Sequence, residues 1–248
     1  PTHCTSSAAS DVYKRQVNGY ESISGQINTE LRKPLTDDKF FLNLFANAME
    51  RLELNAHYTS NLNNKLDHGL YFHTNKKATS ADNNNDGFRD SPTGEQLNIL
   101  NRFQYTNLEK GLVGFFDFNY VFDERVYGEN EYIDGIIFAE NQNYWGGKTD
   151  SEILKINFKF GYVDPMITYR SLGLQFAYTG IDMGSSFGLR NHDTKQTSIY
   201  SNLVYNSIIG DTRSKIKTGI SLTYDEYDEF IFNNNLSLNN FDISRTER

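Results

Sequence analysis

The sequence predicts an all-β protein, a partial antiparallel β-barrel of the kind that crosses a membrane with strands. In a long series of roughly ten-residue stretches, apolar side chains fall on every second position. The connections between these stretches alternate between short and long. Aromatic residues make up 14% of the chain although only 38% is hydrophobic. Strands that need aromatic girdles at two water–lipid boundaries have such a composition.

The composition also excludes several other classes. No window of about 18 apolar residues exists and the mean hydropathy is −0.62, so the sequence contains no transmembrane helix. Four Pro and 18 Gly exclude a collagenous class. A net charge of −8, with no stripe of Lys and Arg, argues against nucleic acid as a partner. An aromatic-rich secreted β-sandwich is the soluble alternative.

The first sixteen residues are predicted to be a non-native leader. They have no period, and DVYKRQ (11–16) resembles the translated end of a sequencing adaptor. Cys4, the one cysteine, falls within them, so the remainder is free of thiols and suits an oxidising compartment. The protein proper is expected to begin with a glycine-bearing segment over 17–34 that leads into a barrel over 35–248. Both ends are expected to be cut from a longer chain.

The period-two stretches define the strands in order. In 153–163, Leu154 and Phe158 fall on one side while Lys155 and Asn157 fall on the other, a segregation that no helix produces. Apolar sets are expected to face lipid and polar sets a hydrated interior. Nine strands are predicted over 40–48, 52–59, 68–76, 97–106, 112–123, 153–163, 169–179, 196–206 and 214–224, with a tenth near 229–238.

The connections provide an independent observation. From the second strand onward, short turns alternate with long connections at 77–96, 124–152 and 180–195. Membrane barrels have tight periplasmic turns and longer external loops. A soluble sandwich has no reason to place every long loop at the same end, so the alternation favours the barrel.

Several stretches resemble the TonB-dependent outer-membrane receptors, in the form common in Bacteroidetes-like bacteria. Residues 82–92 with the strand opening at 97–105 are similar to a loop-and-strand unit of that subgroup, as are 169–180 and 244–247. The segment 18–28 is similar to the end of the family's plug domain, where a small-residue turn leads into the last plug strand. The residues of this plug-end motif are Asn18, Gly19, Tyr20, Glu21, Ser22, Gly25, Gln26 and Asn28.

The resemblance covers essentially all of 17–248 and carries expectations about fold and function. It implies the C-terminal end of a plug domain over 17–34 and the N-terminal part of a 22-stranded barrel over 35–248. It implies a transporter of the Gram-negative outer membrane that takes up a scarce ligand, such as a siderophore or a metal complex. The implied partners are outer-membrane lipid, a small-molecule ligand and a TonB-type energy-coupling protein that acts through the missing N-terminal part.

The sharpest local motif lies at 82–90. Oxygen side chains at alternate positions followed by Gly87 match the first half of an EF-hand-like calcium loop. The twelfth position is Thr93 instead of the bidentate Glu, so Glu95 or another loop would have to complete the site. A solvated turn is the alternative reading. The candidate ligands are Asp82, Asn84, Asp86, the Phe88 carbonyl and Asp90.

Two further groups of residues are candidates for binding. If the turn at 61–67 centres on Lys65, His57 and His73 lie directly opposite each other on the polar face, a spacing that permits shared metal ligation. Cross-strand polar packing is the alternative. The connection 124–152 sets aromatic residues among carboxylates, as a ligand-binding loop would, although loop packing is the more frequent role. These aromatic residues are Tyr127, Tyr132, Tyr144 and Trp145.

Three functions from different classes therefore stand as hypotheses. The first is an energised uptake receptor. The second is a passive porin, which would lack a plug segment before its first strand, and the third is a secreted calcium-dependent β-sandwich that binds carbohydrate. No phosphate-binding loop, dinucleotide fingerprint, zinc-protease helix or serine elbow occurs, so no enzyme activity is predicted. No cofactor is expected apart from the candidate Ca²⁺.

Overall fold

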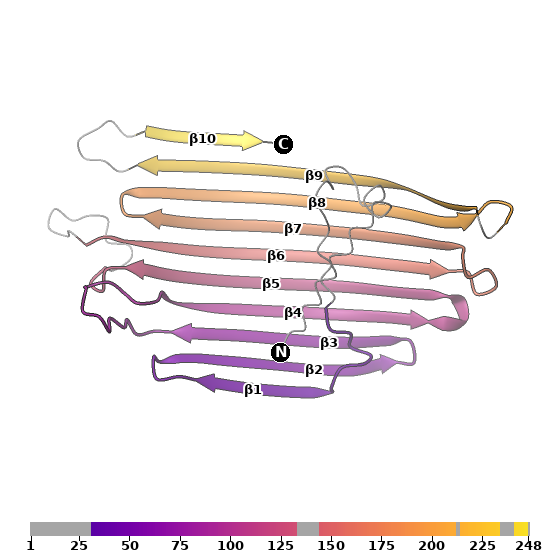
Figure 1. The fold of residues 1–248 in the computed structure, drawn as a ribbon, viewed down its shortest axis with the longest axis horizontal. Helices are drawn as coiled ribbons and strands as arrows, with labels where there is room; N and C mark the ends of the chain where they lie inside the picture. Colours follow the sequence, from indigo (N-terminus) through magenta and orange to yellow (C-terminus); the bar gives the residue numbers. More distant parts are fainter. Residues whose placement is uncertain (1–30, 133–143, 212–213, 234–240, 248) are drawn as a thin grey trace.

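Ten strands form one antiparallel sheet in the order β1 to β10, and each strand pairs with its neighbours in the sequence (Figure 1). The computed structural model describes residues 31–132, 144–211 and 214–233, together with the backbone of 241–247. The strands are β1 (Phe40–Ala46), β2 (Arg51–Asn63), β3 (Leu66–Lys77), β4 (Thr93–Asn107), β5 (Leu112–Gly128), β6 (Gly146–Val163), β7 (Ser171–Phe187), β8 (Arg190–Ile208), β9 (Lys215–Asn233) and β10 (Phe241–Glu247).

The described residues contain one helical turn, η1 (Leu108–Lys110), which links β4 to β5. Gly111 ends this turn at φ 66°, and a side chain there would collide with the backbone oxygen of Val163. No helix in the described ranges is long and apolar enough to span a membrane. The all-β prediction is therefore confirmed.

The pairing register extends the alternation of each strand across the whole sheet, because directly paired residues point to the same side. One row joins Phe103, Phe116, Phe158 and Phe176 from β4 to β7. The side of the sheet that carries this row is called the apolar face. The adjacent row, which points to the other side, joins Arg102, Asp117, Asn157 and Ala177; that side is called the polar face.

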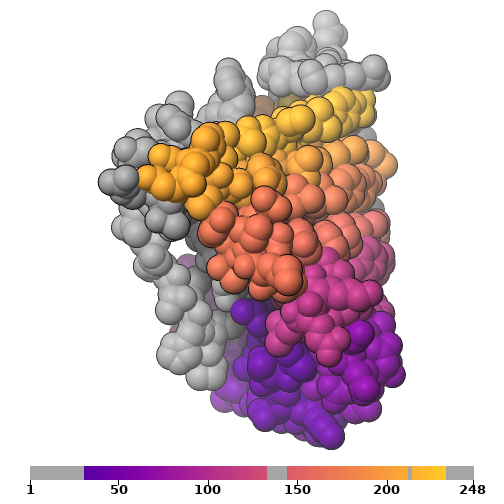
Figure 2. Space-filling view, turned by 90° about the vertical axis from the view of Figure 1, so that its right-hand side faces the viewer, coloured from indigo at the N-terminus to yellow at the C-terminus, as the bar shows by residue number. Residues whose placement is uncertain are grey.

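The apolar face has no second layer of described structure against it. None of the described hydrophobic side chains is buried, and Phe116 and Phe176 are 42% and 37% exposed. A β-sandwich would bury such residues between two sheets about 10 Å apart. Figure 2, which looks onto the end with the short turns, shows the strands stacked in chain order from indigo to yellow. Strands β1 and β10 form the two edges, so the sheet is open.

The predicted long connection at 180–195 is wrong. Strands β7 and β8 continue through most of it and are joined by Gly188 and Leu189 alone. Over this stretch the apolar face carries Asp182 and Lys195, while Ile181 and Met183 lie on the polar face. The apolar residues of β7 thus change to the other face after Tyr178, so the pattern of 169–179 does not continue, although the backbone is extended and fully paired.

The predicted tenth strand near 229–238 also needs correction. Residues 229–233 belong to β9, which runs to Asn233, and 234–240 lie outside the described residues. The tenth strand is formed by Phe241–Glu247, which pairs with the upper part of β9. Strands β7 to β9 thus extend well past their apolar segments at the end opposite the short turns.

The apolar segments form a belt that crosses the strands obliquely. In β2 this segment is centred near Ala56, and in β9 near Ile220. The row through Ile220, followed strand by strand, reaches β2 at Asn63. The belt therefore shifts by about seven residues over seven strand-to-strand steps, or about one residue per strand. With a rise of about 3.3 Å per residue and a strand spacing of about 4.8 Å, this corresponds to a tilt of about 35°.

Candidate functional site

A groove with a volume of about 790 Å³ lies on the polar face, across β1 to β6. Strand pairing gathers its lining residues from six strands, because each strand contributes the same alternate positions to this face. Arg32 from the segment before β1 also lines it, and its guanidinium pairs with the Asp37 carboxylate at 2.9 Å. The polar lining residues are Arg32, Asn43, Asn55, His57, Tyr71, His73, Asn98, Asn119, Lys155 and Asn157.

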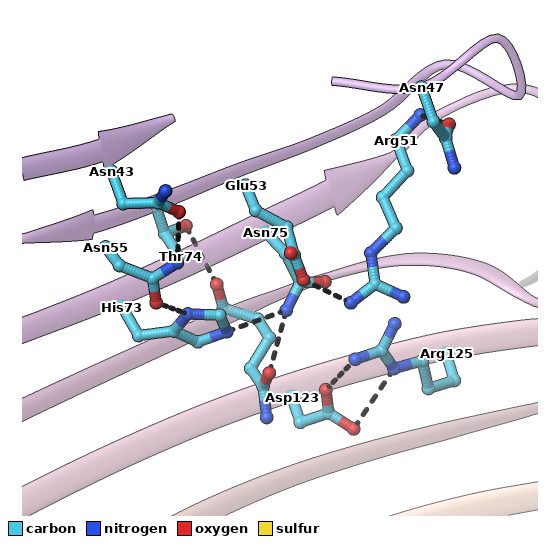
Figure 3. Close-up of polar contacts among 11 residues, drawn as sticks. Asn43, Asn47, Arg51, Glu53, Asn55, His73, Thr74, Asn75, Asp123 and Arg125 are labelled. Atoms are coloured by element: carbon cyan, nitrogen blue, oxygen red, sulfur yellow. Dashed lines mark hydrogen bonds and ion pairs between the residues drawn. The ribbon is translucent and has the colours of Figure 1, made fainter. Parts of the chain in front are cut away.

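A chain of side-chain hydrogen bonds runs across β2, β3 and β4 at one side of the groove (Figure 3). His73 Nδ1 lies 2.6 Å from the Asn55 Oδ1 atom, and Asn75 Nδ2 lies 3.1 Å from His73 Nε2. Asn75 Nδ2 also donates to Gln96 Oε1 at 2.8 Å. The Asn75 Nδ2 atom donates, so His73 accepts this hydrogen bond through Nε2 and donates to Asn55 through Nδ1.

The predicted pairing of His57 with His73 is wrong. The β2–β3 hairpin turns at Asn64 and Lys65 and has a bulge between Asn61 and Asn63, so His57 pairs with Tyr71 and His73 pairs with Asn55. The two histidines share the polar face as diagonal neighbours. The ring nitrogen lone pair of His73 accepts the Asn75 amide, so this imidazole has none free for a metal. Cross-strand polar packing, the alternative reading, describes His73 correctly.

The segment 31–39, called the lead segment, lies against the polar face before it enters β1. Its Pro34 packs over Gly69 of β3, where an added Cβ would lie 3.1 Å from the proline ring. The backbone N–H of Leu35 reaches the Gln104 side chain of β4 at 3.5 Å. Gly69 is thus needed where the lead segment approaches the sheet closely.

Two consecutive aspartates hold the end of the lead segment to β2 and β3. The Asp38 carbonyl accepts hydrogen bonds from His57 Nε2 and Thr59 Oγ1, each at 3.1 Å. The Asp37 carboxylate accepts one from the Tyr71 hydroxyl at 3.2 Å. His57 is only 6% exposed and stacks on Phe41 with ring centroids 5.3 Å apart. Of the predicted plug end at 17–34, only 31–34 are described; Asn18 to Asn28 lie outside the described residues.

A buried ion pair lies next to the lead segment on the polar face. Arg102 Nε and Asp117 Oδ1 are 3.5 Å apart, and their side chains are 7% and 5% exposed. The guanidinium also lies over the Phe115 ring, 4.7 Å from its centroid. Sequence reasoning missed this pair, since nothing but the register joins the two positions.

At the opposite end of the strands, two connections dock onto each other. Phe88 of the β3–β4 connection forms an antiparallel bridge with Glu129 of the β5–β6 connection. The Arg89 Nη2 atom donates to the carbonyl oxygens of Tyr132 at 2.8 Å and Asn130 at 3.2 Å. Burial lowers the pKa of the Arg89 guanidinium from its ordinary value. Sequence reasoning did not single out Arg89, because its partners are backbone oxygens of a distant loop, or Asn130, because its side-chain partners lie about fifty residues earlier in the chain.

The oxygen atoms of the candidate calcium loop make hydrogen bonds within this docked structure. Asp82 accepts from the backbone N–H of Gly87 at 2.9 Å and from the Asn130 side chain at 3.0 Å. Asp86 accepts from the N–H of Phe88, and Asp90 accepts from the N–H of Asn83. Among the described residues, no group of three His, Cys, Asp or Glu side chains is placed to hold a metal ion. Calcium stays a prediction of the sequence pattern.

The four candidate aromatic residues lie around the end of β5 and the start of β6 and have different neighbours. Tyr132 lies over Gly146 and leaves no room for a side chain there, while Tyr127 lies on the polar face with its ring centroid 5.9 Å from that of Phe187. Trp145 is 50% exposed, and its centroid lies 6.5 Å from that of Phe88. A hydrogen bond to Glu131 raises the pKa of the exposed Tyr144 phenol. The calcium-loop residue Phe88 and the loop residue Trp145 are thus brought together.

We expect Arg89→Ala to undock the β3–β4 connection. A hydrogen bond to a charged group contributes about 1.5–3 kcal/mol, so the undocked population should rise by roughly tenfold or more. The rate of nicking within 78–92 by an external protease on the full-length protein in membranes measures this population. Arg125→Ala is the matched control, because that guanidinium bonds Asp123 on its own strand. Equal nicking rates in the two variants would show that Arg89 does not hold the connection.

Comparison with protein-family models, with curated proteins and with solved structures gives no match to this chain.

Proposed function

We propose that this chain forms part of the wall of an outer-membrane β-barrel that works as an energised uptake receptor of the TonB-dependent kind. The oblique apolar belt carries this proposal. Its tilt of about 35° falls at the edge of the range of about 35–45° in which membrane barrels hold their strands. A water-soluble open sheet has no reason to keep its apolar residues at one constant level across tilted strands.

Tyrosines at both borders of the belt support the same function. On the apolar face they stand where the apolar segments end, as interfacial aromatic residues do at the two water–lipid boundaries. At the border nearer the short turns they are Tyr58, Tyr105, Tyr162 and Tyr205; at the other border they are Tyr120, Tyr178 and Tyr224.

The lead segment favours a receptor over a passive porin. It reaches β1 from the polar face, where Asp37 and Asp38 bond to Tyr71, His57 and Thr59. A chain that continues from inside the barrel fits a plug domain that precedes the first strand. The ligand would be captured by the connections at the end opposite the short turns, where Phe88 and Trp145 are exposed. A siderophore or a metal complex is the ligand class that we propose from the family resemblance.

Fractionation and conductance of the full-length protein test this function. We expect the protein in the outer-membrane fraction, and no steady conductance when it is placed in planar bilayers, because a plug closes the passage. A large constant conductance would identify a passive porin instead. Recovery in the soluble fraction without detergent would contradict both membrane functions and favour the secreted carbohydrate-binding alternative.

A further inference from the structure

The groove on the polar face is lined by amides and two cations, and the Asp37 carboxylate beside it pairs with Arg32 at 2.9 Å. Its polar lining consists of five asparagines, two histidines, one tyrosine and the cations Arg32 and Lys155. The chain as a whole carries a net charge of −8. Because Asp37 offsets the charge of Arg32, Lys155 is the lining cation that attracts an anion to the groove.

The charges on the polar face of β2 to β6 also favour an anion over a cation. On these strands that face carries six cationic and four anionic side chains, which leaves an excess of two positive charges. The cationic residues are Arg51, Lys77, Arg102, Arg125, Lys155 and Lys159, and the anionic residues are Glu53, Asp67, Asp117 and Asp123.

The four carboxylates already have polar partners, whereas no carboxylate among the described residues forms an ion pair with Lys77, Lys155 or Lys159. Glu53, Asp117 and Asp123 pair with arginines, and Asp67 accepts a hydrogen bond from Asn61. In the described part of the chain, no carboxylate lies within ion-pair distance of Lys155 or Lys159. Lys77 donates to Ser91, and Lys159 interacts electrostatically with Asp117, so Lys155 is the lysine that carries positive charge at the groove itself.

Amide groups around Lys155 have hydrogen-bonding capacity left. Asn119, directly opposite Lys155, uses both amide hydrogens on Asn98 and on the Ile99 carbonyl, and this leaves the Asn98 amide hydrogens free to donate. Asn157, two residues along β6 on the same face, makes no side-chain hydrogen bond with any described residue. Lys155, Asn98 and Asn157 thus present donors to one space, as a site for oxygen atoms requires.

We propose that this groove binds an anionic ligand rich in oxygen atoms, with the negative charge at Lys155 and hydroxyl or carbonyl oxygens at Asn98 and Asn157. The proposal rests on the proposed function, because the groove meets a ligand when the polar face lines a passage. Two sources share this chemistry, an acidic sugar and an anionic metal chelate. A neutral ligand of the same size gains only the amide contacts.

Isothermal titration of the full-length protein in detergent tests the proposal with three probes: oligogalacturonate, ferric citrate and the neutral sugar maltohexaose. We expect one of the two anionic probes to bind and maltohexaose to bind at least tenfold more weakly. Binding of oligogalacturonate identifies the acidic sugar as the source, and binding of ferric citrate identifies the chelate. Equal affinity for maltohexaose, or binding of none of the probes, would overturn the proposal.

Variants of Lys155 test whether this side chain binds the negative charge of the ligand. Lys155→Gln should weaken binding of the anionic probe by about tenfold, the effect of one charge-assisted hydrogen bond, and Lys155→Arg should restore it. Lys215→Gln, on the polar face of β9 and away from the groove, is the control and should leave binding unchanged. A Lys155→Gln variant that binds like the control would overturn the assignment. The titration does not depend on where the protein lies in the cell. The fractionation result and the groove-binding result can therefore contradict their two proposals independently.

Discussion

Phe158→Arg is expected to destabilise the full-length protein folded in lipid vesicles by about 2–4 kcal/mol, the effect of arginine at the bilayer midplane. Phe158 lies at the centre of the apolar segment of β6, between Phe116 and Phe176 on the neighbouring strands. An arginine there has hydrocarbon around it instead of water. Few single substitutions in this chain should have a larger effect.

Asn157→Arg is the matched control, because the same side chain is introduced one residue away and points to the opposite face. Asn157 pairs with Asp117 and Ala177, so the new guanidinium meets a carboxylate on the polar face instead of hydrocarbon. Urea titration of both variants in vesicles measures the difference. If the two substitutions have equal effects, the two faces do not meet different solvents and the membrane proposal is wrong.

Asp117→Asn is expected to lower the free energy of unfolding by about 3–5 kcal/mol, because it leaves the buried guanidinium of Arg102 without a counter-charge. Both side chains are almost fully buried, so water cannot replace the lost carboxylate. The same titration measures this loss.

The double variant Arg102→Met/Asp117→Leu separates the two contributions. It removes both charges and fills a similar volume, so most of the lost stability should return. A double variant as unstable as the single one would show that Arg102 and Asp117 act independently, and that the ion pair is not what holds this part of the polar face.

The positions of most strands could be predicted from the sequence, because alternation is a property of each strand by itself. The alternation in 153–163 predicted the C-terminal part of β6. The same alternation identified the apolar segments of the other strands. The rule failed for the extension of β7 and β8, where the apolar face carries Asp182 and Lys195. It also failed at the ends of strands such as β5 and β9, which continue past their apolar segments.

The candidate sites were less predictable, because they depend on which residues of different strands are paired. The turn at Asn64 and Lys65 and the bulge at Asn61–Asn63 together shift the register by two residues, so His73 pairs with Asn55 instead of His57 and the predicted metal pair is not formed. The docking of the calcium-like loop onto the β5–β6 connection rests on Arg89 bonds to backbone oxygens, which carry no sequence signal.

The sequence by itself determined that this is a protein of long antiparallel strands with one apolar and one polar face, since period two follows from backbone geometry alone. Only the tertiary structure decided the tilt of the apolar belt, the groove around Lys155 and the buried pair of Arg102 and Asp117. Each of these depends on register, and register is set by turns and bulges that shift whole strands against each other.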